Sequence, residues 1–353
     1  MKLATIQKIH SILPHPNADS LEIGKIKEWP VVIKKGEYKD NDLVIFIQID
    51  SIVPFTNPYF SFLEKQKYRI WNARFRGAPS QGLVCPLSIL PNYTLATSDV
   101  EPYNVPSFGA PTDNTQIVEG IDVTEPIGIT KYEKGLDASI CGDAKGGFPT
   151  HLVSITDEDN LLNYPEILAE LLGVECYITV KADGSSMTTI YNNNEVSVCS
   201  RRLEQKEGTG FWSIANKYDL PSKLKQLNKN IVLQAEACGG KIQGNPMGLT
   251  ELSMFVFNVK EHDTGKWYGY EDIKQTCNLL NIPMVQLVCE PFIFDSTWTV
   301  AKLQEMANKV TYVGADGKTR KGEGMVLRPT VPKYSSTIGK SLSVKILNQD
   351  YKQ

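Results

Sequence analysis

The sequence predicts an α+β protein in which a small β-barrel precedes a larger domain of strands and helices. Residues 2–52 consist of short alternating strands separated by turn residues, a close-set pattern typical of a small barrel or sandwich. From residue 147 onward strands are interrupted by helical patterns near 213–229, 271–280 and 298–309, as in an α+β domain. With 353 residues, each of two domains can bury its own core.

Two stretches of different composition interrupt this pattern. Residues 91–126 are rich in Pro, Thr, Asp and Ser and predict an irregular insertion with little core of its own. Residues 141–149 combine Gly and Pro and predict the join between the domains. After the join, Thr156 and Asp159 stand in capping-box spacing before an apolar run, so we expect a helix to begin there. The expected domains are 1–140 and 147–353.

The composition indicates an ordinary globular protein of the cytoplasm. Hydrophobic residues make up 41% and charged residues 22%. The net charge of −3 means that any nucleic-acid contact must come from local basic patches. The seven cysteines are scattered and never in C-x-x-C spacing, which favours free thiols over disulfides or a zinc site. The chain shows neither a signal-peptide core nor an apolar run of roughly 20 residues, so we expect no membrane partner.

The stretch ITVKADG, residues 178–184, places Lys181 at the end of a strand. Strand alternation puts Lys181 on the polar face, opposite the face that carries Ile178. Asp183 and Gly184 supply the following turn, which brings a carboxylate near the amine. K-x-D-G arises by chance in about one chain in ten of this length, so a solvated lysine and a nucleophile are both open.

A nucleophilic lysine requires other residues that favour its neutral form. At pH 7 only about one free lysine amine in a few thousand is neutral. A nearby metal ion or second lysine would favour the neutral form, whereas a solvated lysine requires neither. Glu236 lies between small apolar residues, Glu323 precedes a strand, and Lys345 lies inside an apolar strand. Phe255 and Phe257 share a strand face and offer an aromatic floor for a base.

In this order, the elements resemble the motifs of the covalent nucleotidyltransferases, which are ATP-dependent RNA and DNA ligases and mRNA capping enzymes. The resemblance implies that Lys181 attacks ATP and carries AMP, and that Phe257 stacks on the base, with Phe255 as the alternative. The implied nucleotide-binding residues are Lys181, Asp183, Gly184, Arg201, Glu236, Phe257 and Lys345. The implied catalytic residues are Lys181, Glu323 and Lys345, and the implied ligands of Mg²⁺ or Mn²⁺ are Asp183, Glu236 and Glu323.

Several features favour RNA ligase within this superfamily. DNA ligases and capping enzymes carry an OB domain after the last motif, whereas here few residues follow Lys345. The N-terminal strands, with LPHPNADSLEIGKI, resemble instead the OB module that precedes the transferase in one group of RNA ligases. Ser186 stands where DNA ligases and capping enzymes place arginine. The sequence departs from the RNA ligase pattern at Ser343, which replaces a lysine for which Lys340 is a candidate substitute, and at Asn258, which replaces an aspartate.

The resemblance implies an OB-fold β-barrel followed by an ATP-grasp-like nucleotidyltransferase domain of antiparallel sheets with flanking helices. The expected protein is a monomeric ATP-dependent RNA ligase that joins 3′-OH and 5′-phosphate ends through lysyl-AMP and RNA-adenylate, in RNA repair. Nicked duplex, single-stranded and mixed RNA/DNA substrates all stay open.

A run of basic residues interleaved with aromatic ones predicts an RNA-binding surface on the OB module, with a solvated loop as the alternative. These basic residues are Lys65, Lys67, Arg69, Arg74 and Arg76. Two alternative functions remain open: a non-catalytic OB-type RNA- or tRNA-binding protein, and a DNA ligase or capping-type transferase. The first leaves Glu236, Glu323 and Lys345 unexplained.

Overall fold

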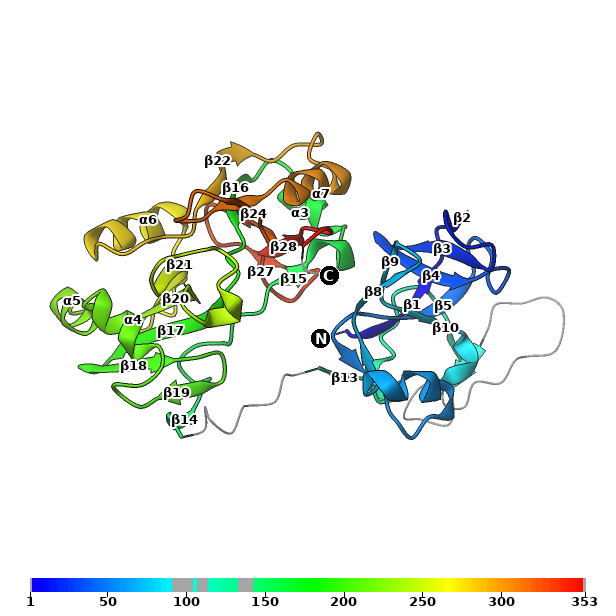
Figure 1. The fold of residues 1–353 in the computed structure, drawn as a ribbon, viewed down its shortest axis with the longest axis horizontal. Coiled ribbons are helices and arrows are strands. Elements are labelled where there is room, and N and C mark those ends of the chain that lie inside the picture. Colours follow the sequence, from blue (N-terminus) through cyan, green and yellow to red (C-terminus); the bar gives the residue numbers. More distant parts are fainter. Residues whose placement is uncertain (1, 91–103, 107–113, 133–141, 352–353) are drawn as a thin grey trace. The chain divides into compact units, whose positions relative to one another are not determined.

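The computed structural model describes residues 2–90, 104–106, 114–132 and 142–351, and the chain divides into two compact units (Figure 1). The units are Met1–Gly135 and Leu136–Lys352. Within the described residues, every helix is too short or too polar to span a lipid bilayer. Cys141 lies outside the described residues, and the six described cysteines are free thiols.

The first unit is built from short strands around one core. Its elements are β1 (Ala4–Lys8), β2 (Ser11–Pro14), β3 (Leu21–Ile26), β4 (Trp29–Lys34), β5 (Leu43–Ile47), β6 (Ser51–Ile52), η1 (Pro58–Gln66), β7 (Arg69–Ile70), β8 (Asn72–Phe75), β9 (Ala78–Gln81), β10 (Leu83–Cys85), η2 (Leu87–Ile89), β11 (Asn104–Pro106), β12 (Asn114–Gln116), α1 (Thr124–Ile127) and β13 (Thr130–Lys131). Neighbouring strands run in the orders β1-β5-β10, β2-β3-β4 and β13-β6-β7, with hairpins β8-β9 and β11-β12. The close-set strands expected from residues 2–52 are therefore present.

The expected insertion extends too far at its C-terminal end. Ile117 and Val123 are buried in the same core as Ile6, although both were assigned to the insertion. The backbone N–H of Val123 also donates to the Ala4 carbonyl at 2.9 Å. The Pro-, Thr- and Ser-rich composition hid these apolar positions. Residues 91–103 and 107–113 of the expected insertion lie outside the described residues.

The second unit contains two large sheets. Its elements are β14 (Ala144–Gly147), β15 (Asp159–Asn160), η3 (Leu161–Asn163), α3 (Ile167–Leu171), β16 (Glu175–Val180), β17 (Ser185–Asn192), β18 (Glu195–Cys199), β19 (Leu203–Gln205), α4 (Trp212–Lys217), α5 (Leu220–Leu227), β20 (Ile231–Cys238), η4 (Ile242–Gly244), β21 (Ser253–Glu261), α6 (Tyr270–Leu279), β22 (Leu287–Ile293), α7 (Val300–Asn308), β23 (Thr311–Val313), β24 (Thr319–Lys321), β25 (Gly324–Pro329), β26 (Tyr334–Ser335), β27 (Lys340–Ser341) and β28 (Val344–Leu347). One sheet has the order β14-β19-β18-β17-β20-β21 and the other β15-β28-β25-β16-β22. All pairs are antiparallel except β15 with β28.

Helices cover one face of each sheet. Apolar residues of α4, α5 and α6 pack on β20 and β21, with Leu224 and Ile273 against Leu233. Apolar residues of α3 and α7 pack on the other sheet, with Leu303 in the same core as Ile178. Figure 1 shows these helices on the outside of the two sheets. The opposite faces contribute polar side chains to a cleft between the two sheets, and the face of the sheet that contains β20 also buries a smaller apolar cluster with Ile190 and Val232.

The helix expected to begin at Thr156 is absent. Asp159 instead pairs in parallel with β28, and the Thr156 hydroxyl lies 3.0 Å from the hydroxyl of Ser186. The apolar run forms only two short helices, η3 before Pro165 and α3 after it, because proline interrupts the run. The helical pattern near 213–229 divides into α4 and α5 at Asp219, whose φ is 52°. The expected helices near 271–280 and 298–309 form as α6 and α7.

Candidate active site

Lys181 lies in the cleft at the end of β16. Ile178 and Val180 are buried in the core behind the sheet, so the predicted alternation is confirmed. The Lys181 backbone N–H donates to the Gly324 carbonyl at 2.9 Å, which joins the lysine to the start of β25. There the Lys181 ammonium pairs with Glu323, with 2.6 Å between Nζ and Oε2.

Glu236 faces Lys181 from the other sheet. It lies on β20 in register with Ser186 on one side and Phe255 on the other. Gly184 makes this approach possible, because a Cβ at that position would lie 2.1 Å from the Ala237 carbonyl oxygen. A glycine is therefore required where the lysine loop crosses β20.

The three predicted carboxylates act on the Lys181 ammonium together. Burial alone would lower the pKa of Lys181, but the Glu323, Glu236 and Asp183 carboxylates outweigh it and raise the pKa above its ordinary value. Burial, opposed by Lys181 and reinforced by the other two carboxylates, raises the pKa of Glu236 to about 7. These side chains thus form a group in which one ammonium is shared among three acidic groups.

This donor set suits a hydrated divalent ion better than an all-protein cage. Among the described residues, no group of three His, Cys, Asp or Glu side chains stands close enough to hold a metal by itself. Mg²⁺ commonly keeps several waters and binds through one or two carboxylates plus substrate phosphates. Asp183, Glu236 and Glu323 fit that mode, since each already interacts with the same cation.

Lys345 stands beside this group on β28. It pairs with Val326 of β25, and its neighbours Val344 and Ile346 are buried behind the sheet. Burial lowers the pKa of Lys345; Asp157 opposes that shift and Lys181 reinforces it. A second lysine therefore lies near Lys181, as the sequence predicted.

Tyr312 links the backbone at Lys181 to the backbone at Glu323. The sequence did not predict this residue. Its hydroxyl donates to the Lys181 carbonyl at 2.5 Å and accepts from the Glu323 backbone N–H at 3.1 Å. The ring is buried, with 4% of its surface exposed. Tyr312 thus fixes the backbone of the lysine relative to that of its carboxylate partner.

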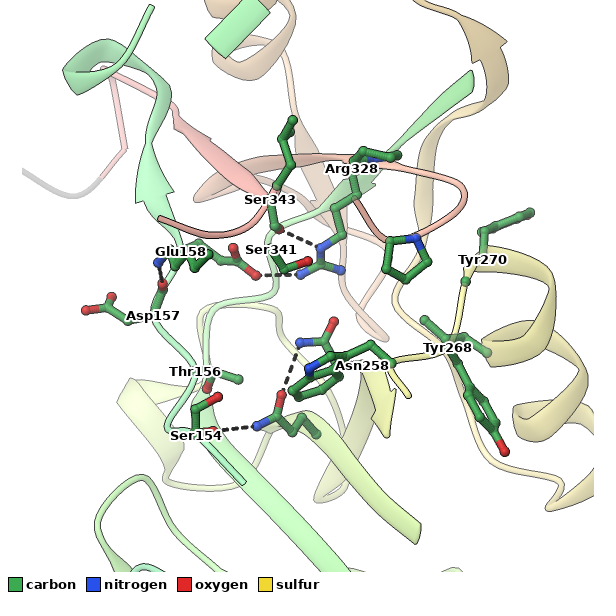
Figure 2. Close-up of a pocket in the computed structure, with 18 of the residues that line it drawn as sticks. Ser154, Thr156, Asp157, Glu158, Asn258, Tyr268, Tyr270, Arg328, Ser341 and Ser343 are labelled. Atoms are coloured by element: carbon green, nitrogen blue, oxygen red, sulfur yellow. Dashed lines mark hydrogen bonds and ion pairs between the residues drawn. The ribbon is translucent and has the colours of Figure 1, made fainter. Parts of the chain in front are cut away.

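A pocket of ≈ 390 Å³ continues the cleft beyond Gln234 (Figure 2). Gln234 and Glu236 are two residues apart on β20 and share a sheet face. Arg328 forms one wall, where it pairs with Glu158 at 2.9 Å and donates to the Ser343 hydroxyl at 2.8 Å. Although burial opposes it, Arg328 lowers the pKa of Glu158 below its usual value. Figure 2 shows this pair in the cleft with Asn258 from the opposite sheet.

The remaining predicted nucleotide-binding residues, Phe257 and Arg201, do not line this pocket but contact residues that do. The Phe257 carbonyl accepts from Arg328 at 3.2 Å, and the Arg328 guanidinium carbon lies 5.6 Å from the centre of the Phe257 ring. Arg201 lies 3.7 Å from Asp157, which lines the pocket. Lys340 also lines it and pairs with Asp159 at 2.9 Å.

The predicted RNA-binding residues lie on the first unit. Arg69 does not fit a free phosphate contact, because it pairs with Asp50 at 2.7 Å and stacks on the Tyr132 ring. Two aromatic residues nearby are exposed, Trp71 at 46% and Phe75 at 49%. The exposed basic residues are Lys65, Lys67, Arg74 and Arg76.

Comparison with known proteins gives the family. Residues 3–87 match an OB-fold domain, and residues 174–346 match the RNA ligase family. A search of curated proteins gives no match. Among solved structures, the chain is similar to an RNA ligase from Naegleria gruberi. The form solved with PPi is 29% identical, with a TM-score of 0.77, and the match covers 99% of this chain and 98% of that one.

Two further structures of the Naegleria gruberi RNA ligase are similar over the same extent. A mutant in the apo form and a mutant with ATP and Mn are each 28% identical, with a TM-score of 0.78, over 99% of this chain and 98% of theirs. The expected fold class is therefore confirmed, with an OB-fold domain before a ligase domain of antiparallel sheets and helices. The chain belongs to the RNA ligase family and carries an N-terminal OB-fold domain.

Proposed function

We propose that this RNA ligase uses ATP and a divalent ion to join RNA 3′-OH and 5′-phosphate ends in the cytoplasm, in RNA repair. The observation that carries the proposal is the Lys181 ammonium held 2.6 Å from Glu323 and within the field of Glu236 and Asp183. ATP and Mn in the similar Naegleria ligase structures support the choice of nucleotide and metal.

The first step is attack of Lys181 Nζ on the α-phosphorus of ATP. A P–N bond forms, the bond to the β-phosphate oxygen breaks, pyrophosphate leaves and the amine loses its protons. In the metal-free protein the carboxylates hold the amine in its charged form, so they must be neutralised before attack. Asp183, Glu236 and Glu323 would hold a divalent ion, which would supply that neutralisation and would offset charge on the α-phosphate.

Lys345 contributes a fixed positive charge close to the reacting phosphate. It lies on β28 beside Lys181, on the face opposite the buried Val344 and Ile346, and is half-buried. We assign it to the α-phosphate, where charge grows as pyrophosphate leaves. Arg201 and Phe257, at the edge of the adjoining pocket, are assigned to the ribose or phosphate and to the base.

The pocket beyond Gln234 accounts for nucleoside binding. Its volume of ≈ 390 Å³ falls within the range of small-molecule sites, and its walls mix aromatic and hydrogen-bonding side chains. Arg328 stands where it can compensate for the lysine that Ser343 replaces, because its guanidinium donates directly to the Ser343 hydroxyl.

The second and third steps need an RNA-binding surface. AMP passes from Lys181 to the RNA 5′-phosphate, and the RNA 3′-OH then displaces AMP to form the new phosphodiester. On the first unit, Trp71 and Phe75 are exposed in and beside the β8-β9 hairpin, close in sequence to exposed Arg74 and Arg76. Aromatic rings and cations mixed in this way bind single strands by stacking and by phosphate contacts.

Label transfer tests the proposal. The protein is incubated with α-³²P-ATP and Mn²⁺ and run on a denaturing gel, beside Lys181→Ala and beside α-³²P-GTP. Label from ATP on the wild type, absent from Lys181→Ala, followed by transfer to 5′-phosphorylated RNA, is the expected result. No label on the wild type would favour a non-catalytic RNA-binding protein, and label from GTP alone a capping-type transferase.

Replacement of Trp71 by alanine should weaken RNA binding without affecting self-adenylylation. Loss of one stacked base costs about 1–3 kcal/mol, so we expect the Kd for a single-stranded RNA to rise about 5- to 150-fold. Fluorescence anisotropy with labelled RNA measures the Kd. Leu13→Ala, which removes another exposed apolar side chain from the same unit, is the control. An unchanged Kd for Trp71→Ala would exclude stacking at this hairpin.

A further inference from the structure

Tyr351 reaches the active site from the segment that follows β28. Its hydroxyl donates a hydrogen bond to Oδ2 of Asp183, the acidic residue of the lysine loop. Asp183 is 9% exposed, so few other donors can approach this oxygen. The contact joins a residue outside all the predicted motifs to one of the proposed metal ligands.

The segment that carries Tyr351 is firmly held. The Asn348 side-chain amide donates to the Gly322 carbonyl at 3.0 Å, and the Asn348 backbone N–H donates to the Glu323 carbonyl at 2.9 Å. Asn348 then closes a turn, since its Oδ1 accepts from the Asp350 N–H at 2.9 Å and its carbonyl from the Tyr351 N–H at 3.1 Å.

A second anchor ties the turn to α7. The Gln349 backbone N–H donates to Oδ1 of Asn308 at 2.9 Å, and Gln304 donates to the Leu347 carbonyl at 2.7 Å. These bonds fix the direction of the chain before Tyr351. Asn348 is 4% exposed, which shows that the turn is built into the domain.

We propose that Tyr351 is a positioning residue that orients the Asp183 carboxylate toward the divalent ion, an inference that rests on the proposed function. The Tyr351 hydroxyl donates to Oδ2 of Asp183 and so fixes the rotation of the carboxylate. Oδ1 is then the oxygen presented to the ion or to its water. Hydrogen bonds of this kind orient metal ligands, and their loss costs about 10–100-fold in metal affinity or activity.

A purely structural role makes a different prediction. If Tyr351 only fastens the end of the chain, its hydroxyl contributes to thermal stability and not to metal binding. Tyr351→Phe keeps the ring and removes only the donor, so the two roles separate in one variant. Tyr334→Phe is the matched control, because Tyr334 is 68% exposed in the same unit and, among the described residues, forms no hydrogen bond with the three carboxylates.

Two measurements on the full chain test the proposal. The first is the Mn²⁺ concentration at half-maximal self-adenylylation. The second is the Mn²⁺ midpoint for the rise in Tm with α,β-methylene-ATP, which cannot donate AMP, so that binding is read without chemistry. For Tyr351→Phe we expect both midpoints to rise about tenfold with the KM for ATP unchanged, and for Tyr334→Phe no shift.

The outcomes separate this proposal from the proposed function. Unchanged Mn²⁺ midpoints for Tyr351→Phe, with or without a lower Tm, would overturn the positioning role while wild-type labelling leaves the ligase function standing. A wild type that takes no label at any Mn²⁺ concentration would overturn both.

Discussion

Glu323→Gln should lower self-adenylylation by about 10²–10³-fold. Glu323 is the carboxylate in direct contact with Lys181, and it raises the pKa of that amine. If its only effect were to keep the amine charged, glutamine would free the amine and labelling at neutral pH would rise. If Glu323 also holds the divalent ion at the α-phosphate, labelling falls by the amount typical of a lost electrostatic contact in a transition state.

The direction of the change therefore decides between the two roles. Initial rates of label transfer from α-³²P-ATP at pH 7, over a range of Mn²⁺ concentrations, measure it. Glu305→Gln is the control, because Glu305 also pairs with a lysine, Lys309, but on the exposed surface of α7. A rate for Glu323→Gln equal to or above the wild-type rate would remove Glu323 from the metal site.

Glu236→Gln should abolish most activity and at the same time stabilise the metal-free protein at alkaline pH. Burial raises the pKa of Glu236 to about 7, above the ordinary value of 4.5. Between these two values the folded state binds more protons than the unfolded state, so the free energy of unfolding falls as pH rises through this window. Glutamine does not titrate, so the variant does not lose this part of the free energy of unfolding, which amounts to up to about 3 kcal/mol above pH 7.

Urea unfolding of both proteins in chelator-treated buffer at pH 5 and pH 8 measures this difference. Groups distant from the site titrate alike in the two proteins, so the change in relative stability between the two pH values reports on Glu236 and on Lys181, whose pKa Glu236 helps to raise. We expect the glutamine variant to gain on the wild type as pH rises, while its Mn²⁺-dependent labelling falls by about 10²-fold or more. Parallel stability curves would show that Glu236 titrates normally.

Strand alternation carried most of the correct predictions. The side chains of β16 follow a period of two, so the sequence alone places Lys181 on the cleft-facing side, whereas Glu236 and Lys345 were identified by their apolar surroundings and by the order of the family motifs. Register between strands then brings them together. The family motifs supplied the pairing that periodicity alone could not.

The errors have local causes. Thr156 and Asp159 match a capping box, but strand pairing of Asp159 with β28 overrides that preference. Arg69 looks like a phosphate contact in the sequence, yet Asp50 and Tyr132 engage it in the fold.

Other features depend on contacts between distant residues and leave no local signal. Tyr312 contacts Lys181 across 131 positions, and Tyr351 contacts Asp183 across 168. The same holds for the buried pair of Arg328 and Glu158, 170 positions apart. A tyrosine near the end of a strand predicts nothing by itself, so these residues could be found only from the structure.

The Lys181 ammonium partly neutralises the three acidic groups that surround it. Lys181 and the three carboxylates serve as one another's counter-ions, so part of the negative charge of the carboxylates is offset within the site. A divalent ion must compete with the Lys181 ammonium for the carboxylates. An ion that arrives bound to the phosphates of a nucleotide gains additional contacts, so it competes better than the ion alone. Lys181 should therefore become a nucleophile only when nucleotide and metal bind together.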